Sequence, residues 1–154
     1  MVYMMKILPP AWFVYAFLKA IGEGFASWGI GDSRLELVYP YLVSATPSLF
    51  YSVTVGAVYL LIVKTAPSRT VSVLGWAHLI CTAVSAVGGI WYTRLTYKLS
   101  LGGASRADAV YHSLIFPAGV QFGASIFAAI FFLIVVFIAY RNVTAPSIKA
   151  QNFD

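Results

Sequence analysis

Charged residues are scarce in this sequence. Of its 154 residues only 10% are charged, whereas 60% are hydrophobic, and the mean hydropathy of the chain is +0.84. A water-soluble domain carries roughly a quarter charged residues, and a soluble chain with so few would be expected to aggregate. The composition therefore excludes an ordinary soluble protein and predicts an integral membrane protein whose surface is covered by lipid.

Cysteine, basic clusters and catalytic motifs are also lacking. Cys81 is the single cysteine, which excludes an intrachain disulfide. The net charge of +5 comes from ten Lys and Arg against five Asp and Glu, scattered singly, so nothing predicts nucleic-acid binding. There is no HExxH, CxxC or phosphate-binding glycine loop, and no Ser, His and Asp set. The sequence therefore predicts no catalytic residue, metal ligand or cofactor, and a protein that is not an enzyme.

Three long apolar runs are present, and each is long enough to cross a bilayer. They cover Tyr41 to Val63, Val71 to Thr93 and Ser113 to Tyr140, where a spanning helix needs about 20 residues. Backbone groups in hydrocarbon must be bonded within the segment, which predicts that each run is a helix.

A fourth candidate, Pro10 to Ile30, contains two charges. Lys19 lies near its middle and Glu23 follows four residues later, so the charge-free part is too short to span alone. The whole segment is either a fourth spanning helix or a helix that is interfacial or re-entrant.

An internal repeat favours the spanning alternative. Gly31 to Phe50 can be laid on Gly103 to Phe122 without a gap, and a Thr-Ala-Pro-Ser sequence follows both, at Thr65 and Thr144. The identical pairs are Gly31/Gly103, Ser33/Ser105, Arg34/Arg106, Val38/Val110, Tyr39/Tyr111, Leu42/Leu114 and Phe50/Phe122. A duplication predicts an all-α polytopic membrane protein with four transmembrane helices, arranged as two parallel-repeat helical hairpins.

The repeat also predicts the organisation of the chain. Residues 1–154 form a single transmembrane domain, with copies over residues 8–70 and 71–149 and a tail over 150–154. We expect both termini and residues 64–70 on one face of the membrane. The turns at Gly31 and Gly103, with a loop over 93–110, are expected on the opposite face. Lys and Arg number five on the terminal face and four on the other, which predicts cytoplasmic termini: Lys6, Lys64, Arg69, Arg141 and Lys149 against Arg34, Arg94, Lys98 and Arg106.

The repeated Gly-x-Ser-Arg-x-acid motif has two interpretations. Ser33 with Glu36, and Ser105 with Asp108, have the spacing of a helix-capping box. Capping leaves the two arginines unexplained, and Arg binds phosphate well. The alternative is an interfacial site for a lipid or a partner, formed by Arg34, Glu36, Arg106 and Asp108.

Lys19 and Glu23 form the candidate intramembrane polar pair. They are one helical turn apart and can pair, and charges at this depth are costly enough to mark a functional site. The alternative is a helix at the bundle edge with Lys19 reaching the interface. His78 and His112, the only histidines, are expected on the order of 30 Å apart along the membrane normal, too far for one haem.

The expected helix over Ser113 to Tyr140 carries a candidate packing face. Gly119 and Gly123 form a GxxxG pattern beside Gln121, which allows a close contact within the chain or between chains. The sequence favours a non-catalytic membrane protein, an accessory or scaffolding subunit of a larger membrane complex or a homo-oligomer. The alternative is a small carrier, channel or lipid-binding protein that uses Glu23 and Lys19.

Overall fold

Four long α-helices make up the described part of the chain. The structure is a computed structural model and describes residues 2–27, 34–102 and 107–151. The helices are α1 (Val2–Ser27), α2 (Arg34–Thr65), α3 (Arg69–Gly102) and α4 (Ala107–Gln151). The prediction of an all-helical chain with four long helices is confirmed over these residues. Ser33, Ser105 and Arg106 of the repeated motif lie outside the described residues.

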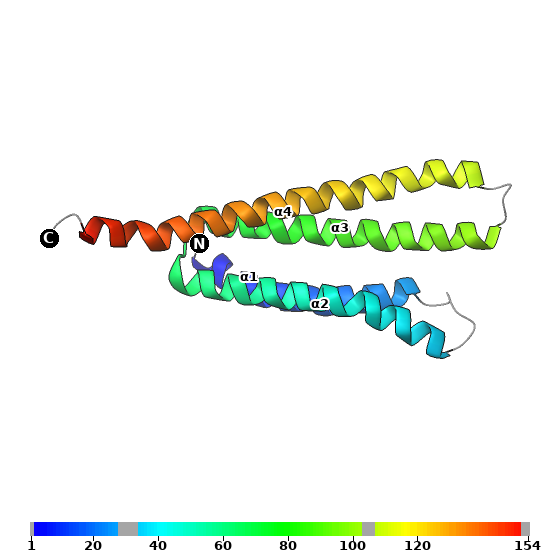
Figure 1. The fold of residues 1–154 in the computed structure, drawn as a ribbon, viewed down its shortest axis with the longest axis horizontal. Coiled ribbons are helices and arrows are strands. Elements are labelled where there is room, and N and C mark those ends of the chain that lie inside the picture. The colour runs from blue at the N-terminus through cyan, green and yellow to red at the C-terminus, as the bar shows by residue number, and fades with distance from the viewer. Residues whose placement is uncertain (1, 28–33, 103–106, 152–154) are drawn as a thin grey trace.

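The helices are arranged as two side-by-side pairs. α1 packs along α2, and α3 packs along α4. The two pairs are joined mainly by contacts between α1 and α3, whereas α2 and α4 make very little contact. In Figure 1, α1 and α3 run in one direction and α2 and α4 in the other. The start of α1 and the α2–α3 connection lie at one end of the molecule, and the pairs diverge toward the other end. The superposition of one pair on the other stays a prediction.

The first helix begins earlier than the expected start at Pro10. It starts at Val2 and contains Pro9 and Pro10, although proline inside a helix removes a hydrogen bond and crowds the preceding turn. Tertiary contacts of that turn oppose this cost, because Leu8 is fully buried and Trp76 Nε1 donates to the Met4 carbonyl at 3.2 Å.

The third and fourth helices are also longer than expected. α3 continues to Gly102, so most of the loop expected over residues 93–110 is helical. α4 runs through Pro146 to Gln151 and does not end at the Thr-Ala-Pro-Ser sequence. A proline disfavours helix in the residue before it without forbidding it; nothing in the structure explains why the same tetrapeptide ends α2 and not α4.

The hydrophobic core lies in the half of the molecule where all four helices meet. Its members come from the first half of α1, the second half of α2, the first half of α3 and the distal part of α4. They are Met5, Leu8, Trp12, Val55, Tyr59, Ile62, Ala66, Val71, Leu79, Val135 and Ala139. Toward the other end, contacts are made mainly within each pair and between α1 and α3.

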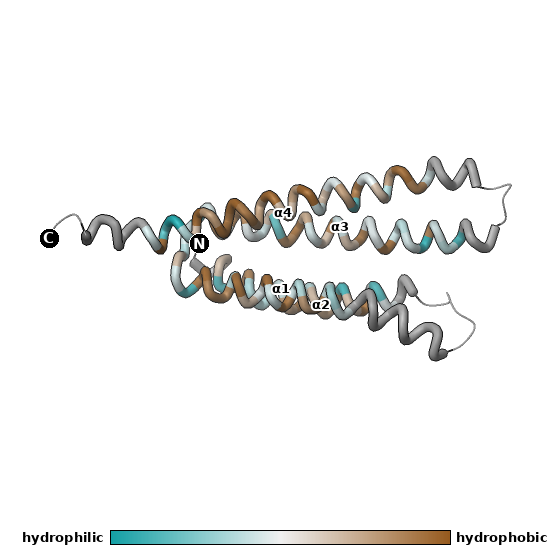
Figure 2. Tube along the Cα trace, viewed as in Figure 1, coloured by the Kyte–Doolittle hydropathy of each residue, from teal (hydrophilic) through white to brown (hydrophobic). Residues whose placement is uncertain are grey.

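All four helices contain a stretch long and apolar enough to cross a membrane. These stretches are Met4–Gly24, Thr46–Thr65, Arg69–Lys98 and Ser113–Thr144. Figure 2 shows hydrophobic residues along the helices and hydrophilic ones mostly near the helix ends. By length and composition α1 is therefore also long and apolar enough to span, although its stretch is the least apolar of the four and carries Lys19 and Glu23.

Glycines mark the close approaches between helices. A Cβ on Gly56 of α2 would lie 3.3 Å from Trp12 Cβ, and one on Gly22 of α1 would lie 2.9 Å from Ile90 Cδ1. The tightest backbone approach is between α3 and α4, where a Cβ on Gly88 would lie 3.0 Å from the Gln121 backbone nitrogen and 3.2 Å from the Pro117 carbonyl oxygen. Small residues at such positions let the backbones of two helices pack directly.

We expect Gly88→Ala to destabilise the α3–α4 pair. The added methyl group meets backbone atoms, which cannot rotate away, so the helices must separate at a cost of about 1–3 kcal/mol. Gly123→Ala is the matched control, because nothing lies within 4 Å of a Cβ at that position. Thermal unfolding of both variants in detergent measures the difference. Equal melting temperatures would show that α3 and α4 do not approach each other as described.

Candidate functional site

His78 of α3 lies in the core, and side chains from the other three helices contact it. The residue is 0% exposed and lies nine residues from the start of α3, about 14 Å along the helix axis. Tyr59 Oη lies 3.0 Å from Nδ1, and Tyr51 Oη lies 3.3 Å from Nε2. Both ring nitrogens of His78 therefore have hydroxyl partners on α2. A neutral imidazole has one donor and one acceptor nitrogen, so one tyrosine donates to it and the other accepts.

Aromatic rings surround His78 on its other sides. The indole ring of Trp12 on α1 lies 4.7 Å from the imidazole, and the ring of Phe132 on α4 lies 5.0 Å from it. Trp12 also stacks on Tyr59 at 6.0 Å and meets Tyr51 edge-on at 6.5 Å. We call Trp12, Tyr51, Tyr59, His78 and Phe132 the histidine cluster.

Trp12 has a hydrogen-bonding group that the rest of the cluster does not satisfy. The side chain is 0% exposed, and Nε1 is buried with no hydrogen-bond partner among the residues that the structure describes. Buried polar groups in proteins are nearly always hydrogen-bonded, so this donor is the least expected feature of the cluster.

The sequence argued only against a haem shared by His78 and His112, and it did not predict the cluster. The residues are far apart in the chain and each is common in apolar helices. The one available signal was a lone histidine inside an apolar run, since a buried imidazole needs hydrogen-bond partners and tyrosines are frequent in the preceding helix. His112 lies five residues into α4, and its side chain lies outside the described part. α4 begins at the end of the molecule opposite the α2–α3 connection (Figure 1).

The predicted polar pair forms between neighbouring turns of α1. Lys19 Nζ lies 3.5 Å from Glu23 Oε1, with side chains 21% and 20% exposed. Ser48 of α2 adds a partner that the sequence did not indicate, since its Oγ donates to Glu23 Oε2 at 2.9 Å. The carboxylate therefore links α1 to α2 near the end where the two pairs diverge.

The predicted interfacial site is described only in its backbone. Arg34 and Glu36 lie in the first turn of α2 and Asp108 lies in the first turn of α4, but their side chains, like Arg106, lie outside the described part. α2 and α4 begin at the same end of the molecule (Figure 1). Whether these residues bind a lipid or a partner stays a prediction.

The predicted packing residues of α4 separate into two kinds. Gln121 packs against α3, where a Cβ on Gly89 would lie 3.2 Å from its Nε2. Gly119 and Gly123 face away from the other helices of the described part, where no atom of theirs lies within 4 Å of a Cβ built on either glycine. The α3–α4 contact is made instead by Gly88, and by Ser85, whose Oγ lies 2.7 Å from Ser125 Oγ.

Within the described residues, no group of three or more His, Cys, Asp or Glu side chains is placed to hold a metal ion. Cys81 is a free, half-buried thiol on α3. No protein family, curated protein or solved structure matches this chain.

We expect His78→Leu to destabilise the protein mainly through Tyr59. Removing the imidazole leaves the buried Tyr59 hydroxyl without its partner, at a cost of about 1–3 kcal/mol in addition to the lost packing. Tyr59→Phe in the His78→Leu background should recover part of this loss, because the stranded hydroxyl is gone. A double-mutant cycle of thermal unfolding in detergent measures this coupling. Strictly additive effects of the two substitutions would contradict the described hydrogen bond.

We expect Lys19→Leu to be more destabilising than the double substitution Lys19→Leu/Glu23→Leu. The single change leaves a half-buried carboxylate with Ser48 but without its cation, whereas replacing a dry pair by apolar residues is often neutral or stabilising. The difference should be about 1–3 kcal/mol, measured by unfolding in detergent with Glu23→Leu as the third corner. A double variant no more stable than Lys19→Leu would mean that the pair itself does not stabilise the fold.

Proposed function

We propose that this protein is a multi-pass integral membrane protein with four spanning helices, and that it serves as a non-catalytic accessory or scaffolding subunit, either of a larger membrane complex or of a homo-oligomer. The exposed surface of the helices supports the membrane location. Only 33%, 28%, 22% and 17% of the four apolar stretches, in chain order, are buried inside the chain. Water does not cover so much apolar surface in a stable monomer, so lipid or protein must.

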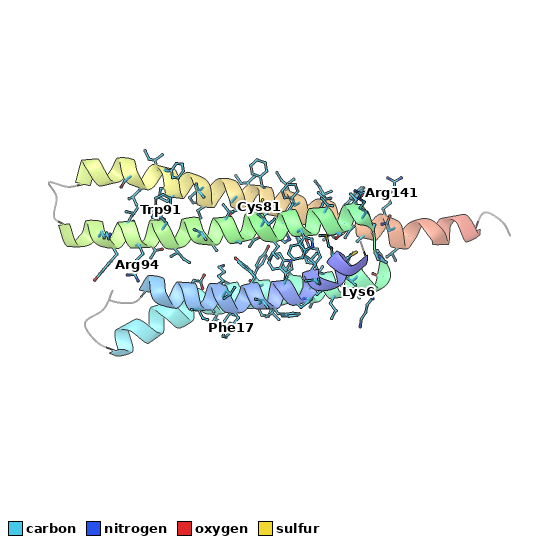
Figure 3. The ribbon with its side chains drawn as sticks, turned by 180° about the vertical axis from the view of Figure 1, so that it is seen from behind. Lys6, Phe17, Cys81, Trp91, Arg94 and Arg141 are labelled. Carbon is cyan, nitrogen blue, oxygen red and sulfur yellow. The ribbon has the colours of Figure 1, made fainter. Side chains whose placement is uncertain are left out.

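The distribution of charge is also that of a membrane protein. Lys6 and Arg141 lie toward one end of the molecule and Arg94 toward the other (Figure 3), while α4 between Ser113 and Tyr140 contains no charged residue. Phe17 extends outward from α1 between these ends (Figure 3). Cations at both ends with apolar side chains between them suit headgroup layers on either side of hydrocarbon.

The single observation that carries the subunit proposal is the outer face of α4. A Cβ on Gly22, Gly56, Gly75 or Gly88 meets a neighbouring helix, whereas one on Gly119 or Gly123 meets no atom of another helix within 4 Å among the residues described. In hydrocarbon a glycine pair of this spacing gains little from lipid contact, and its usual role is to admit a second helix. The exposed side chains near these glycines are apolar, including Phe116, Phe122 and Ile126.

A carrier is the second candidate, and the position of Glu23 favours it. A carboxylate on a membrane-spanning helix is the group that proton- or cation-coupled transport requires. However, Lys19 and Ser48 already neutralise and bind it. A subunit therefore accounts for the geometry better. Glu23→Gln separates the two, since it should abolish transport in a carrier and leave assembly intact in a subunit.

We expect Gly119→Leu/Gly123→Leu to abolish association and to leave the isolated chain folded. A Cβ at either position has no described atom of another helix within 4 Å, whereas a leucine there blocks the approach of a second helix. The measurement is the mass of the complex extracted from native membranes in mild detergent, by native mass spectrometry, with helix content as the folding control. Ile126→Leu, which changes the same helix without changing side-chain volume, is the control. A wild-type chain that extracts as a folded monomer without other subunits would contradict the proposal.

A further inference from the structure

The direction of the hydrogen bonds in the histidine cluster can be assigned from burial. Tyr59 is 0% exposed, and His78 Nδ1 is its hydroxyl's partner among the described residues. A buried hydroxyl hydrogen needs an acceptor. If Nδ1 carried the proton, Tyr59 would have to accept and its own hydrogen would be stranded. Tyr59 therefore donates to Nδ1, and the proton of the neutral imidazole is on Nε2.

This assignment leaves Tyr51 as a hydrogen-bond donor to something outside the cluster. Nε2–H of His78 donates to Tyr51 Oη, so the hydrogen of the Tyr51 hydroxyl must point elsewhere. Tyr51 is 44% exposed, and it lies on α2 within the stretch that can span a membrane. The Tyr51 side chain therefore lies at the edge of the cluster, bonded to the buried His78 and partly exposed on the outer surface of the chain.

A second donor lies next to it. Trp12 Nε1 is the buried group without a partner among the described residues, and the Trp12 and Tyr51 rings are 6.5 Å apart. An indole N–H is a donor only. Two neighbouring rings thus each carry a hydrogen without an acceptor among the described residues, that of Tyr51 half-exposed and that of Trp12 buried.

We propose that the histidine cluster binds the carbonyl oxygen of an uncharged apolar molecule that enters from the lipid phase, and that this oxygen accepts hydrogen bonds from Trp12 Nε1 and Tyr51 Oη. A carbonyl oxygen has two lone pairs and brings no hydrogen of its own, so it matches a pair of donors. Water fits this site less well, because its two hydrogens would need acceptors and both nitrogens of His78 are already bonded.

The ligand is uncharged because the cluster offers no counter-charge. His78 contacts Trp12, Tyr51, Tyr59 and Phe132, none of which is cationic. An anion without a paired charge is strongly disfavoured in such surroundings. The inference rests on the proposed membrane location but not on the proposed association through α4.

The test measures the carbonyl stretching band of a labelled ketone. The full-length chain is reconstituted in nanodiscs of ether-linked phospholipid, which contains no ester carbonyl, and dodecan-2-one carrying ¹³C at its carbonyl is titrated. We expect the protein to produce a second, saturable band at lower wavenumber than the ketone in empty nanodiscs. Trp12→Phe and Tyr51→Phe should each move this band back toward the free position and weaken apparent affinity about fivefold to tenfold, as the loss of one hydrogen bond does.

Trp91→Phe is the matched control, because Trp91 is exposed on α3 and outside the cluster, and it should leave the band unchanged. Tyr51→Phe, at a half-exposed position, keeps the test valid if Trp12→Phe fails to fold. Absence of a saturable band in the wild type, or the same band in both cluster variants, would overturn the proposal. A failure to reconstitute at all would instead contradict the membrane location.

Two further arms identify the source of the oxygen. Ester-linked lipid that competes with the ketone would show that a lipid carbonyl is the natural occupant, and an unchanged titration would show that a free carbonyl compound is; both support a carbonyl site. The indole ¹⁵N–¹H signal of Trp12, assigned by Trp12→Phe, is recorded with and without ketone. A signal that exchanges with water and does not respond to saturating ketone would show that water occupies the site, and would overturn the proposal.

Discussion

The hydrogen bond between Tyr59 and His78 is the interaction on which the packing of the two helix pairs depends. It joins α2 to α3 at 3.0 Å, Tyr51 of α2 bonds the other ring nitrogen at 3.3 Å, and the remaining contacts of the imidazole are with the rings of Trp12 and Phe132. Apolar packing between helices in lipid has little directional preference, because lipid tails are as apolar as the side chains. A buried polar group accepts few alternatives, since moving it strands a donor or an acceptor. The histidine therefore fixes how the two pairs meet, while leucines and valines fill the space around it.

Glycines set the distance between the helices once this arrangement is fixed. Gly56 admits Trp12 against α2, and Gly75 admits Leu8 and Tyr59 against α3, which brings the aromatic rings within reach of His78. A side chain at either glycine would move the rings that close the cluster. The polar centre and the close helix contacts are thus one arrangement, since α1 supplies Trp12 only because α2 and α3 leave room for it.

Length and composition were sufficient to predict that the helices exist, but they did not predict which residues of different helices contact one another. The four apolar stretches follow from the scarcity of charge, and the start of α2 follows from the polar residues before it. The predicted start of α1 at Pro10 was wrong. Contacts of Met4 and Leu8 with α3 outweigh the cost of the two prolines in the helix, and such contacts are not local in sequence. The GxxxG pattern of α4 indicated a packing face. Only the three-dimensional structure shows that Gly119 faces outward whereas Gly88 of α3 faces α4. The histidine cluster was missed for the same reason, because its residues come from four helices.

The two unusual features of the molecule lie on different surfaces, and this separation bears on what the protein does. The donors Trp12 and Tyr51 belong to the half where the four helices converge, whereas the open glycines lie on α4 and face away from the rest of the chain. A partner helix on α4 would leave Tyr51 on α2 accessible, because α2 and α4 make very little contact. Association and ligand binding are therefore compatible in one molecule. A subunit held in a complex through α4 would present the histidine cluster, on its other side, to the lipid.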